Sequence, residues 1–173
     1  MNHPHRRRVV ALATGALLTA GTALAAPAST ATATATADAQ RTPLVVNARW
    51  GGHCTYDRIV VDLRGHVPQV EVTRVPKLVQ DGSGKPVPLP GTHFLQIRLH
   101  PAQAHDRSGQ SVYHGPKLAR IRLPKLQGLA MTGDFEGYVT FGAGFRGKPA
   151  FRSFTLHAPE RFVLDVAHRN TCG

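Results

Sequence analysis

The sequence predicts an all-β fold, a single-domain β-sandwich of about nine short strands with few or no helices. Several short segments alternate apolar and polar residues, which is the pattern of strands that bury one face. No segment keeps the 3.6-residue apolar period, with capping residues, that indicates a helix. The 13 prolines and 17 glycines suit many short strands joined by tight turns.

The alternation is clearest in the segment RIVVDL at 58–63, which places Ile59, Val61 and Leu63 on one face. The segments DGSG at 81–84 and DRSG at 106–109 are expected to be turns, because aspartate bonds to the nearby backbone and glycine accepts positive φ. Residues 144–149 are expected to be the turn of a hairpin. The expected strands are 44–49, 58–63, 69–75, 94–100, 118–123, 129–132, 138–141, 151–156 and 161–166.

Residues 1–25 are predicted to be a removable export signal. Three arginines at 6–8 precede an apolar run that ends in Ala-Leu-Ala at 23–25, the order of features in a secretory signal. The alternative is a retained membrane anchor, but the run falls short of the ~20 apolar residues of a membrane span. Residues 26–43 are rich in Ala, Thr and Pro without large apolar side chains, and they are expected to form a disordered leader. The folded domain is expected at 44–173, with no transmembrane span.

The charge balance favours anionic partners. Lysine and arginine total 21 against 10 acidic residues, a formal net charge of +11, and removal of the three signal arginines leaves 18 minus 10, or +8. Such a surface attracts polyanions, which outside a cell are wall polymers such as peptidoglycan or anionic glycopolymers. Nucleic acid is not an expected partner, because the compartment is wrong and the charge is not gathered in one tract.

The chain has two cysteines, Cys54 and Cys172, near the two ends of the expected domain. Two cysteines in an exported chain most often pair. In the chain-entropy model, a disulfide that closes a loop this long stabilises the folded protein by roughly 4–5 kcal/mol. The alternatives are two free thiols or a crosslink to another chain.

One sequence pattern occurs twice, as RIVVDL at 58–63 and RFVLDV at 161–166. The two-residue period of a strand puts the arginine and aspartate of each copy on the same face. We interpret the copies as two equivalent strands whose Arg58, Asp62, Arg161 and Asp165 form cross-strand charge pairs. The alternative is a charged ledge that binds a ligand.

Five ordered motifs resemble the AMIN-like domain, found in exported proteins and lipoproteins of high-GC Gram-positive bacteria. They are YDRIVVDL at 56–63, DGSG at 81–84, YHGP at 113–116, GDFEG at 133–137 and PERFVLDV at 159–166. The resemblance covers about 45–168. It implies a kinship with AMIN domains, which are sandwiches of two small sheets that bind peptidoglycan and position amidases and secretins. The family-motif residues carried over are Asp57, Arg58, Asp62, Tyr113, Asp134, Glu136, Arg161 and Asp165.

The best candidate for catalysis is the carboxylate pair Asp134 and Glu136. In an extended segment residues i and i+2 project to one side about 7 Å apart, a separation used by inverting glycosidases. The alternative is a solvated turn between Gly133 and Gly137. No nucleophile motif of the G-x-S-x-G or S-x-x-K type is present, so an enzyme is not expected.

No cofactor and no metal site are expected either. A loop-rich stretch contains His100, His105, Asp106 and His114. Its spacing matches no zinc signature, and no helix aligns the ligands.

A basic binding surface is the favoured hypothesis for function. Arg120 and Arg122 alternate, so both are expected on one strand face. Phe145 lies closest to the expected turn and is the candidate for an exposed aromatic contact, whereas Phe141 and Phe154 are expected in the core. The candidate surface is Arg74, Lys77, Lys117, Arg120, Arg122 and Phe145.

These features favour a secreted, non-enzymatic module that binds a cell-envelope polymer. One alternative is a secreted wall-glycan hydrolase that uses Asp134 and Glu136. Another is a protein–protein interaction module that uses a sheet edge or Phe145. The oligomeric state stays open.

Overall fold

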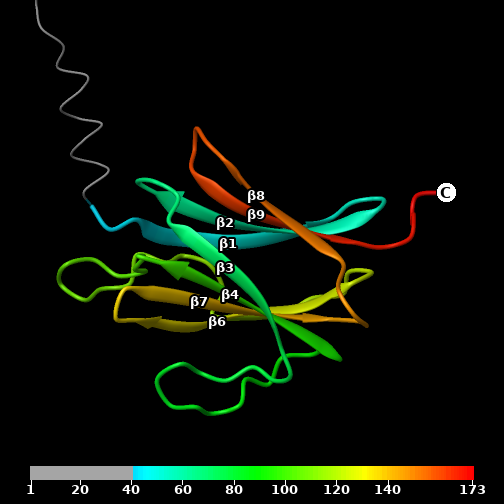
Figure 1. The fold of residues 1–173 in the computed structure, drawn as a ribbon, viewed down its shortest axis with the longest axis horizontal. Helices are drawn as coiled ribbons and strands as arrows, with labels where there is room; N and C mark the ends of the chain where they lie inside the picture. Colours follow the sequence, from blue (N-terminus) through cyan, green and yellow to red (C-terminus); the bar gives the residue numbers. More distant parts are fainter. Residues whose placement is uncertain (1–40) are drawn as a thin grey trace, which may run out of the picture.

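The computed structural model describes residues 41–173 and shows two antiparallel sheets stacked as a sandwich (Figure 1). One sheet has the order β1-β2-β9-β8 and the other β3-β4-β7-β6-β5. The all-β sandwich is therefore confirmed. The strands are β1 (Leu44–Gly52), β2 (Tyr56–Arg64), β3 (Gln69–Val75), β4 (His93–His100), β5 (Leu118–Arg120), β6 (Leu126–Phe135), β7 (Tyr138–Phe145), β8 (Phe151–Leu156) and β9 (Arg161–Ala167).

Residues 1–40, which hold the predicted export signal and most of the predicted leader, lie outside the described part of the chain. From residue 41 onward the backbone forms strands, turns and loops, and this part contains no helix that could cross a membrane.

The predicted hairpin at 144–149 is wrong. β7 lies between β4 and β6, so both of its edges are already paired. β8 pairs instead with β9 in the other sheet. The segment at 146–150 therefore crosses from one sheet to the other, a connection typical of β-sandwiches.

The main core lies between the two sheets. Ile59, Val61 and Leu63 point into it from β2, as their alternation predicts. Along β7 the same period places Phe141 and Phe145 inside. Phe145 is 0% exposed, so its expected role as an exposed contact is wrong, because β7 continues up to it. Phe154 is also misplaced by the prediction, since it is half-buried and lies outside the main core.

A second, smaller apolar cluster lies on the outer face of the five-stranded sheet. The β3–β4 connection, visible as the lower loop in Figure 1, packs Leu78, Val87 and Leu89 against Ala130 of β6. Glycine makes this approach possible, because a Cβ on Gly142 would lie 2.7 Å from the Leu78 side chain. The connection therefore covers part of this sheet face and leaves the rest accessible.

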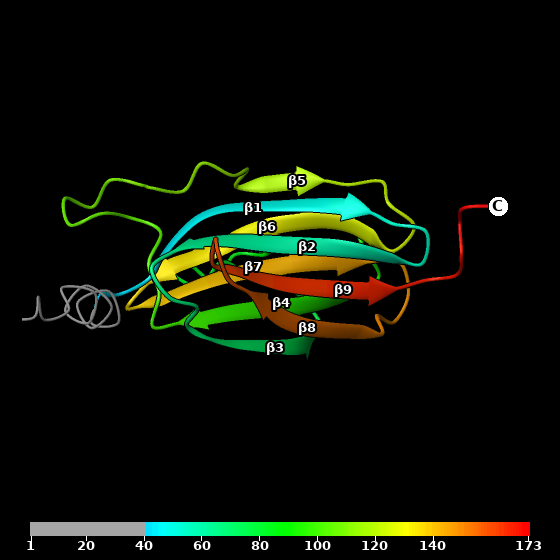
Figure 2. The same cartoon turned by 90° about the horizontal axis from the view of Figure 1, so that it is seen from above.

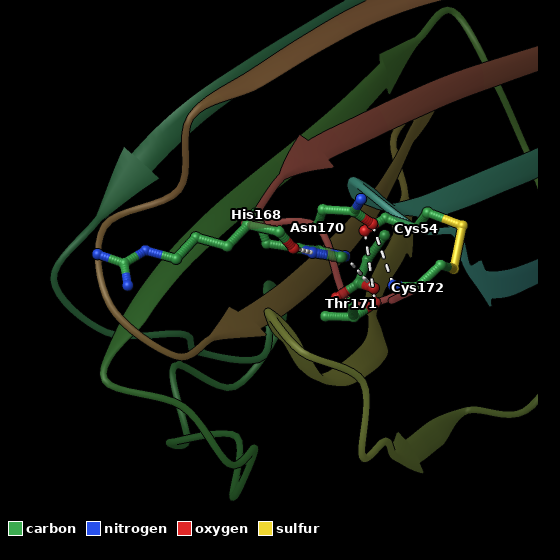
Figure 3. The surroundings of a disulfide bond; sticks show 7 residues. Cys54, His168, Asn170, Thr171 and Cys172 are labelled. Carbon is green, nitrogen blue, oxygen red and sulfur yellow. Dashed lines mark hydrogen bonds and ion pairs between the residues drawn. A yellow bond between two sulfur atoms is a disulfide. The ribbon is translucent and has the colours of Figure 1, made fainter.

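A disulfide joins Cys54 in the β1–β2 turn to Cys172 after β9 (Figure 3). The two Cα atoms are 5.1 Å apart across 118 residues of sequence. The Thr171 amide donates to the Cys54 carbonyl at 2.8 Å and extends the contact. The predicted pairing is thus confirmed, and it ties the C-terminal segment to one end of the four-stranded sheet.

Candidate functional site

The outer face of the four-stranded sheet carries a row of charges across three strands. Cross-strand register places Asp165 of β9 between Arg58 of β2 and Arg152 of β8 (Figure 2 looks onto this sheet). Arg58 donates to both carboxylate oxygens, at 2.6 Å from Nε and 2.9 Å from Nη2. Arg152 adds two bonds to Oδ2, at 3.0 and 3.2 Å. The repeated motif predicted cross-strand pairs between its arginines and aspartates, and Arg58 with Asp165 is such a pair.

The Asp165 carboxylate is 3% exposed, and its surroundings keep it ionised. Burial alone would raise its pKa, but the hydrogen bonds from Arg58 and Arg152 together outweigh burial and hold the pKa below the usual value. The same hydrogen bond raises the pKa of Arg58. Because two guanidinium groups share one carboxylate, the row keeps a positive charge, and the Arg152 side chain is 71% exposed.

Aromatic rings support these guanidinium groups. The Arg58 guanidinium lies 5.0 Å from the Tyr56 ring centre and 5.4 Å from that of Phe154. Arg152 lies 5.7 Å from the same Phe154 ring. Such cation–π contacts fix the orientation of an arginine without consuming its hydrogen-bond donors. Phe154 therefore packs against the arginines of the outer sheet face and not in the core between the sheets.

A second row of charges runs parallel to the first. Arg49 of β1 binds Asp62 of β2 through two bonds, at 2.9 and 3.0 Å, and the hydrogen bond raises the pKa of Arg49. Arg161 stands opposite Asp62 in the register, yet its Nε donates to the Pro159 carbonyl at 3.0 Å. Asp62 and Arg161, the other two charged residues of the repeated motif, therefore do not pair with each other, and Asp62 pairs with Arg49 instead. We call the two rows the arginine ledge: Arg49, Arg58, Arg152 and Arg161 with Asp62 and Asp165.

A hollow of about 580 Å³ opens at one end of the ledge. An anion in it would meet the Arg152 guanidinium beside two aromatic side chains, an arrangement suited to carboxylate or phosphate. The lining residues are Thr55, Tyr56, Ala150, Phe151, Arg152, Asp165, Ala167 and His168.

A buried polar cluster underlies this end of the sheet. Asp57 Oδ2 accepts the amides of Lys125 and Leu126 at 2.7 and 2.8 Å, which ties β2 to the start of β6. Asp57 Oδ1 lies 3.3 Å from Nε2 of His168, and the His168 side chain is buried. Its Nδ1 lies 2.7 Å from the Arg169 carbonyl. Family-motif residue Asp57 therefore connects strands and does not face a ligand.

The predicted basic residues do not form one surface. Arg74 lies in β3 and Lys77 in the loop after it. Lys117 directly precedes β5, and Arg120 is its last residue. β3 and β5 are the two opposite edges of the five-stranded sheet, an order that alternation within a strand does not reveal. β5 ends at Arg120, but Arg120 and Arg122 are both exposed, in keeping with their alternation.

The predicted carboxylate pair is divided between two places. Asp134 accepts the Ala104 amide at 3.0 Å and lies 2.8 Å from Nδ1 of His105. Glu136 has φ of 49° and forms, with Gly137, the turn between β6 and β7. The segment is therefore not extended at Glu136, and the expected geometry of a hydrolase pair is wrong.

The loop that holds the histidines is organised by its own hydrogen bonds. Asp106 accepts the amides of Ser108 and Gln110 at 2.9 and 3.0 Å. The bond from the Ser108 hydroxyl is the main reason that the pKa of Asp106 is lowered. No group of three or more His, Cys, Asp or Glu side chains among residues 41–173 could hold a metal ion.

Tyr113 of the YHGP motif is a packing residue. Its ring meets Phe141 at 5.9 Å between centres, and its hydroxyl donates to the Pro116 carbonyl at 3.2 Å. Burial raises its pKa to about 12. A Cβ on Gly115 would lie 2.4 Å from the Tyr113 hydroxyl, so the motif's glycine makes room for this ring.

A second concave region was missed by sequence reasoning. Two hollows of about 410 and 190 Å³ lie on the outer face of the five-stranded sheet and share Arg98 and Tyr138. Phe135 lines the larger one and is 65% exposed. The available signal was Phe135 in the GDFEG motif, an aromatic residue that the prediction of a carboxylate pair left without a role.

Comparison with known proteins gives one match, to a family. No curated protein and no solved structure matches the chain. The family model of the AMIN-like domain matches residues 43–168, which include all nine strands. The resemblance carried by the five motifs is thereby confirmed, and the chain belongs to the AMIN-like domain family.

Proposed function

We propose that this protein is an exported, non-enzymatic module that binds an anionic polymer of the cell envelope, peptidoglycan or an anionic glycopolymer, on its arginine ledge. The observation that carries the proposal is the charge excess of the ledge, four arginines against two aspartates on one sheet face. Because Asp165 is already shared by two arginines, the exposed donors of Arg152 are available to a ligand anion.

Three further observations support this assignment. Family membership relates the chain to cell-envelope modules. The disulfide fits an oxidising compartment outside the cytosol, and the sequence of residues 1–25 has the pattern of an export signal. The separation of Asp134 from Glu136 supports the non-enzymatic part of the proposal.

The test is a pull-down of the protein on purified cell-wall sacculi across a salt series. The double variant R49Q/R152Q removes two charges from the ledge, and R120Q/R122Q removes two from the β5 edge as a matched control. Each lost charge-assisted contact is worth about tenfold in affinity, so the ledge variant should bind at least about tenfold more weakly while the control keeps most of its binding.

Equal losses in the two variants would mean that net charge alone drives the binding, and the ledge would lose its assignment. Absence of binding by the unmodified protein at low ionic strength, where charge attraction is strongest, would overturn the proposed function.

A further inference from the structure

Three carboxylates stand apart from the other acidic residues of the fold. Residues 41–173 contain nine acidic residues. Five of them form ion pairs with arginine or histidine, and Asp106 caps its own turn. Within this described part, the three that form no ion pair are Glu71, which stands opposite Arg98 in the strand register, Asp81 and Glu136.

All three carboxylates line a pair of adjacent hollows on the outer face of the five-stranded sheet. Asp81 and Glu136 line its larger hollow, and Glu71 lines the smaller one. The two hollows are adjacent, because Arg98 and Tyr138 line both of them. We call the two hollows together the aromatic groove, whose lining includes Glu71, Asp81, Arg98, Phe135, Glu136 and Tyr138.

The groove offers aromatic surface to a ligand. Phe135 is paired with Tyr138 across the turn and exposes 65% of its surface, so much of this residue is open to a ligand. Tyr138 already stacks on His100 at 4.1 Å and carries the Arg98 guanidinium at 4.6 Å. Aromatic rings beside carboxylates attract cations by two mechanisms at once, the ring quadrupole and direct charge.

The backbone at Glu136 is strained for a glutamate. Glu136 and Gly137 have φ of 49° and 78°, as in two-residue hairpin turns that favour Asn, Asp or Gly at both positions. A glutamate in this left-handed region costs stability that an asparagine would not. Strain of this kind is characteristic of functional positions, and here it places a long carboxylate side chain at the rim of the aromatic groove.

We propose that the aromatic groove binds an extended, lysine- or arginine-bearing segment of another protein. Charge complementarity carries the choice: the groove has three carboxylates against one guanidinium, on a fold with 18 basic and nine acidic residues from 41 to 173. It spans the sheet from β3 to β6, three inter-strand spacings or about 14 Å, which four or five extended residues match. The ledge lies on the other sheet, so the groove is a separate site of opposite charge.

The consequence is a bridging role. One sheet would bind an anionic polymer, and the other would hold a basic protein beside it. The inference about the groove stands independently of the ledge, because neither set of lining residues includes a member of the other.

The experiment measures binding of a seven-residue synthetic peptide with two lysines four positions apart, by calorimetry at low salt, with a glutamine-substituted peptide as the control ligand. E71Q and E136Q should each weaken lysine-peptide binding about fivefold or more. E160Q removes the same charge outside the groove and should leave the affinity unchanged. E136N should bind the lysine peptide weakly and yet unfold at a higher temperature than the unmodified protein, because the turn strain is relieved. Its loss of affinity then cannot come from misfolding.

Three results would overturn the inference. The first is an affinity for the lysine peptide that equals that for the glutamine peptide. The second is E71Q and E136Q proteins that bind as tightly as E160Q. The third is binding of neutral N-acetylglucosamine oligomers that F135A abolishes and E136Q leaves intact, which would assign the groove to a glycan. Sacculus binding by the ledge is measured separately, so failure of either assignment leaves the other intact.

Discussion

Replacement of Asp57 tests whether this family-motif residue holds the two sheets together. Its carboxylate is 1% exposed and accepts two backbone amides, those of Lys125 and Leu126. In an alanine variant both amides stay buried or half-buried without this acceptor, at about 1–3 kcal/mol each. His168 would also lose its acidic neighbour. The expected loss for Asp57→Ala is therefore about 3–5 kcal/mol of unfolding free energy.

The assay is urea unfolding with the disulfide intact, read by tryptophan fluorescence of Trp50. Asp57→Asn keeps one carbonyl oxygen for the two amides and turns its NH₂ group toward His168, so it should lose only about 1–2 kcal/mol. The double variant D57A/H168A should lose less than the sum of the single losses, because the two side chains face each other. A loss below about 1 kcal/mol for Asp57→Ala, or equal losses for alanine and asparagine, would refute the reasoning.

Three further predictions concern the disulfide, the glycine-lined face and the charge row. Cys172→Ser should lower the unfolding free energy by about 4–5 kcal/mol for a loop of this length, and reduction of the unmodified protein should lower the urea midpoint equally. Gly144→Ala should destabilise by about 1–3 kcal/mol or more, because its Cβ would lie 2.1 Å from the Pro90 carbonyl oxygen, whereas Gly51→Ala, with nothing within 4 Å, should change stability by less than about 0.5 kcal/mol. The lowered pKa of Asp165 means that its ion pairs contribute fully above the unfolded pKa of about 3.9 and lose their contribution as pH falls through the folded value. Asp165→Asn should therefore flatten the acid decline of stability, and an unchanged decline in circular-dichroism melts would contradict this.

Local alternation predicts most of the fold. The nine expected strands all exist, and the strands at 69–75 and 151–156 have the expected bounds. The repeated motif also predicted cross-strand pairing of its charged residues, and Arg58 and Asp165, which lie 107 residues apart, form such a pair. These predictions succeed because the two-residue period depends only on neighbouring residues and on one buried face per sheet.

The errors concern strand order and contacts between distant segments. Arg74 and Arg120 were assigned to one surface, although sheet order places their strands at opposite edges. The contact of Asp57 with His168 joins residues that no local pattern relates. The error at Phe145 has a local cause. Phe145 follows Phe141 by four residues and so shares its face of a strand, but the expected strand ended at 141, whereas β7 continues to Phe145. The glycines at 142 and 144 are a similar local signal. Two glycines on the same face of a strand indicate that another segment packs closely against that face.

The net charge of the chain is a poor guide to the local charge of either sheet face, because it averages over two faces that differ in sign. On the four-stranded sheet each outward aspartate of the ledge is matched or outnumbered by arginine, so the local charge of the ledge is positive. On the five-stranded sheet Glu71, Asp81 and Glu136 gather around a single guanidinium, and the local sign reverses. The close-packed core between the sheets keeps the two faces apart. A sandwich with one such face on each side presents two surfaces of opposite local sign, and the net charge of +11 reflects only one of them.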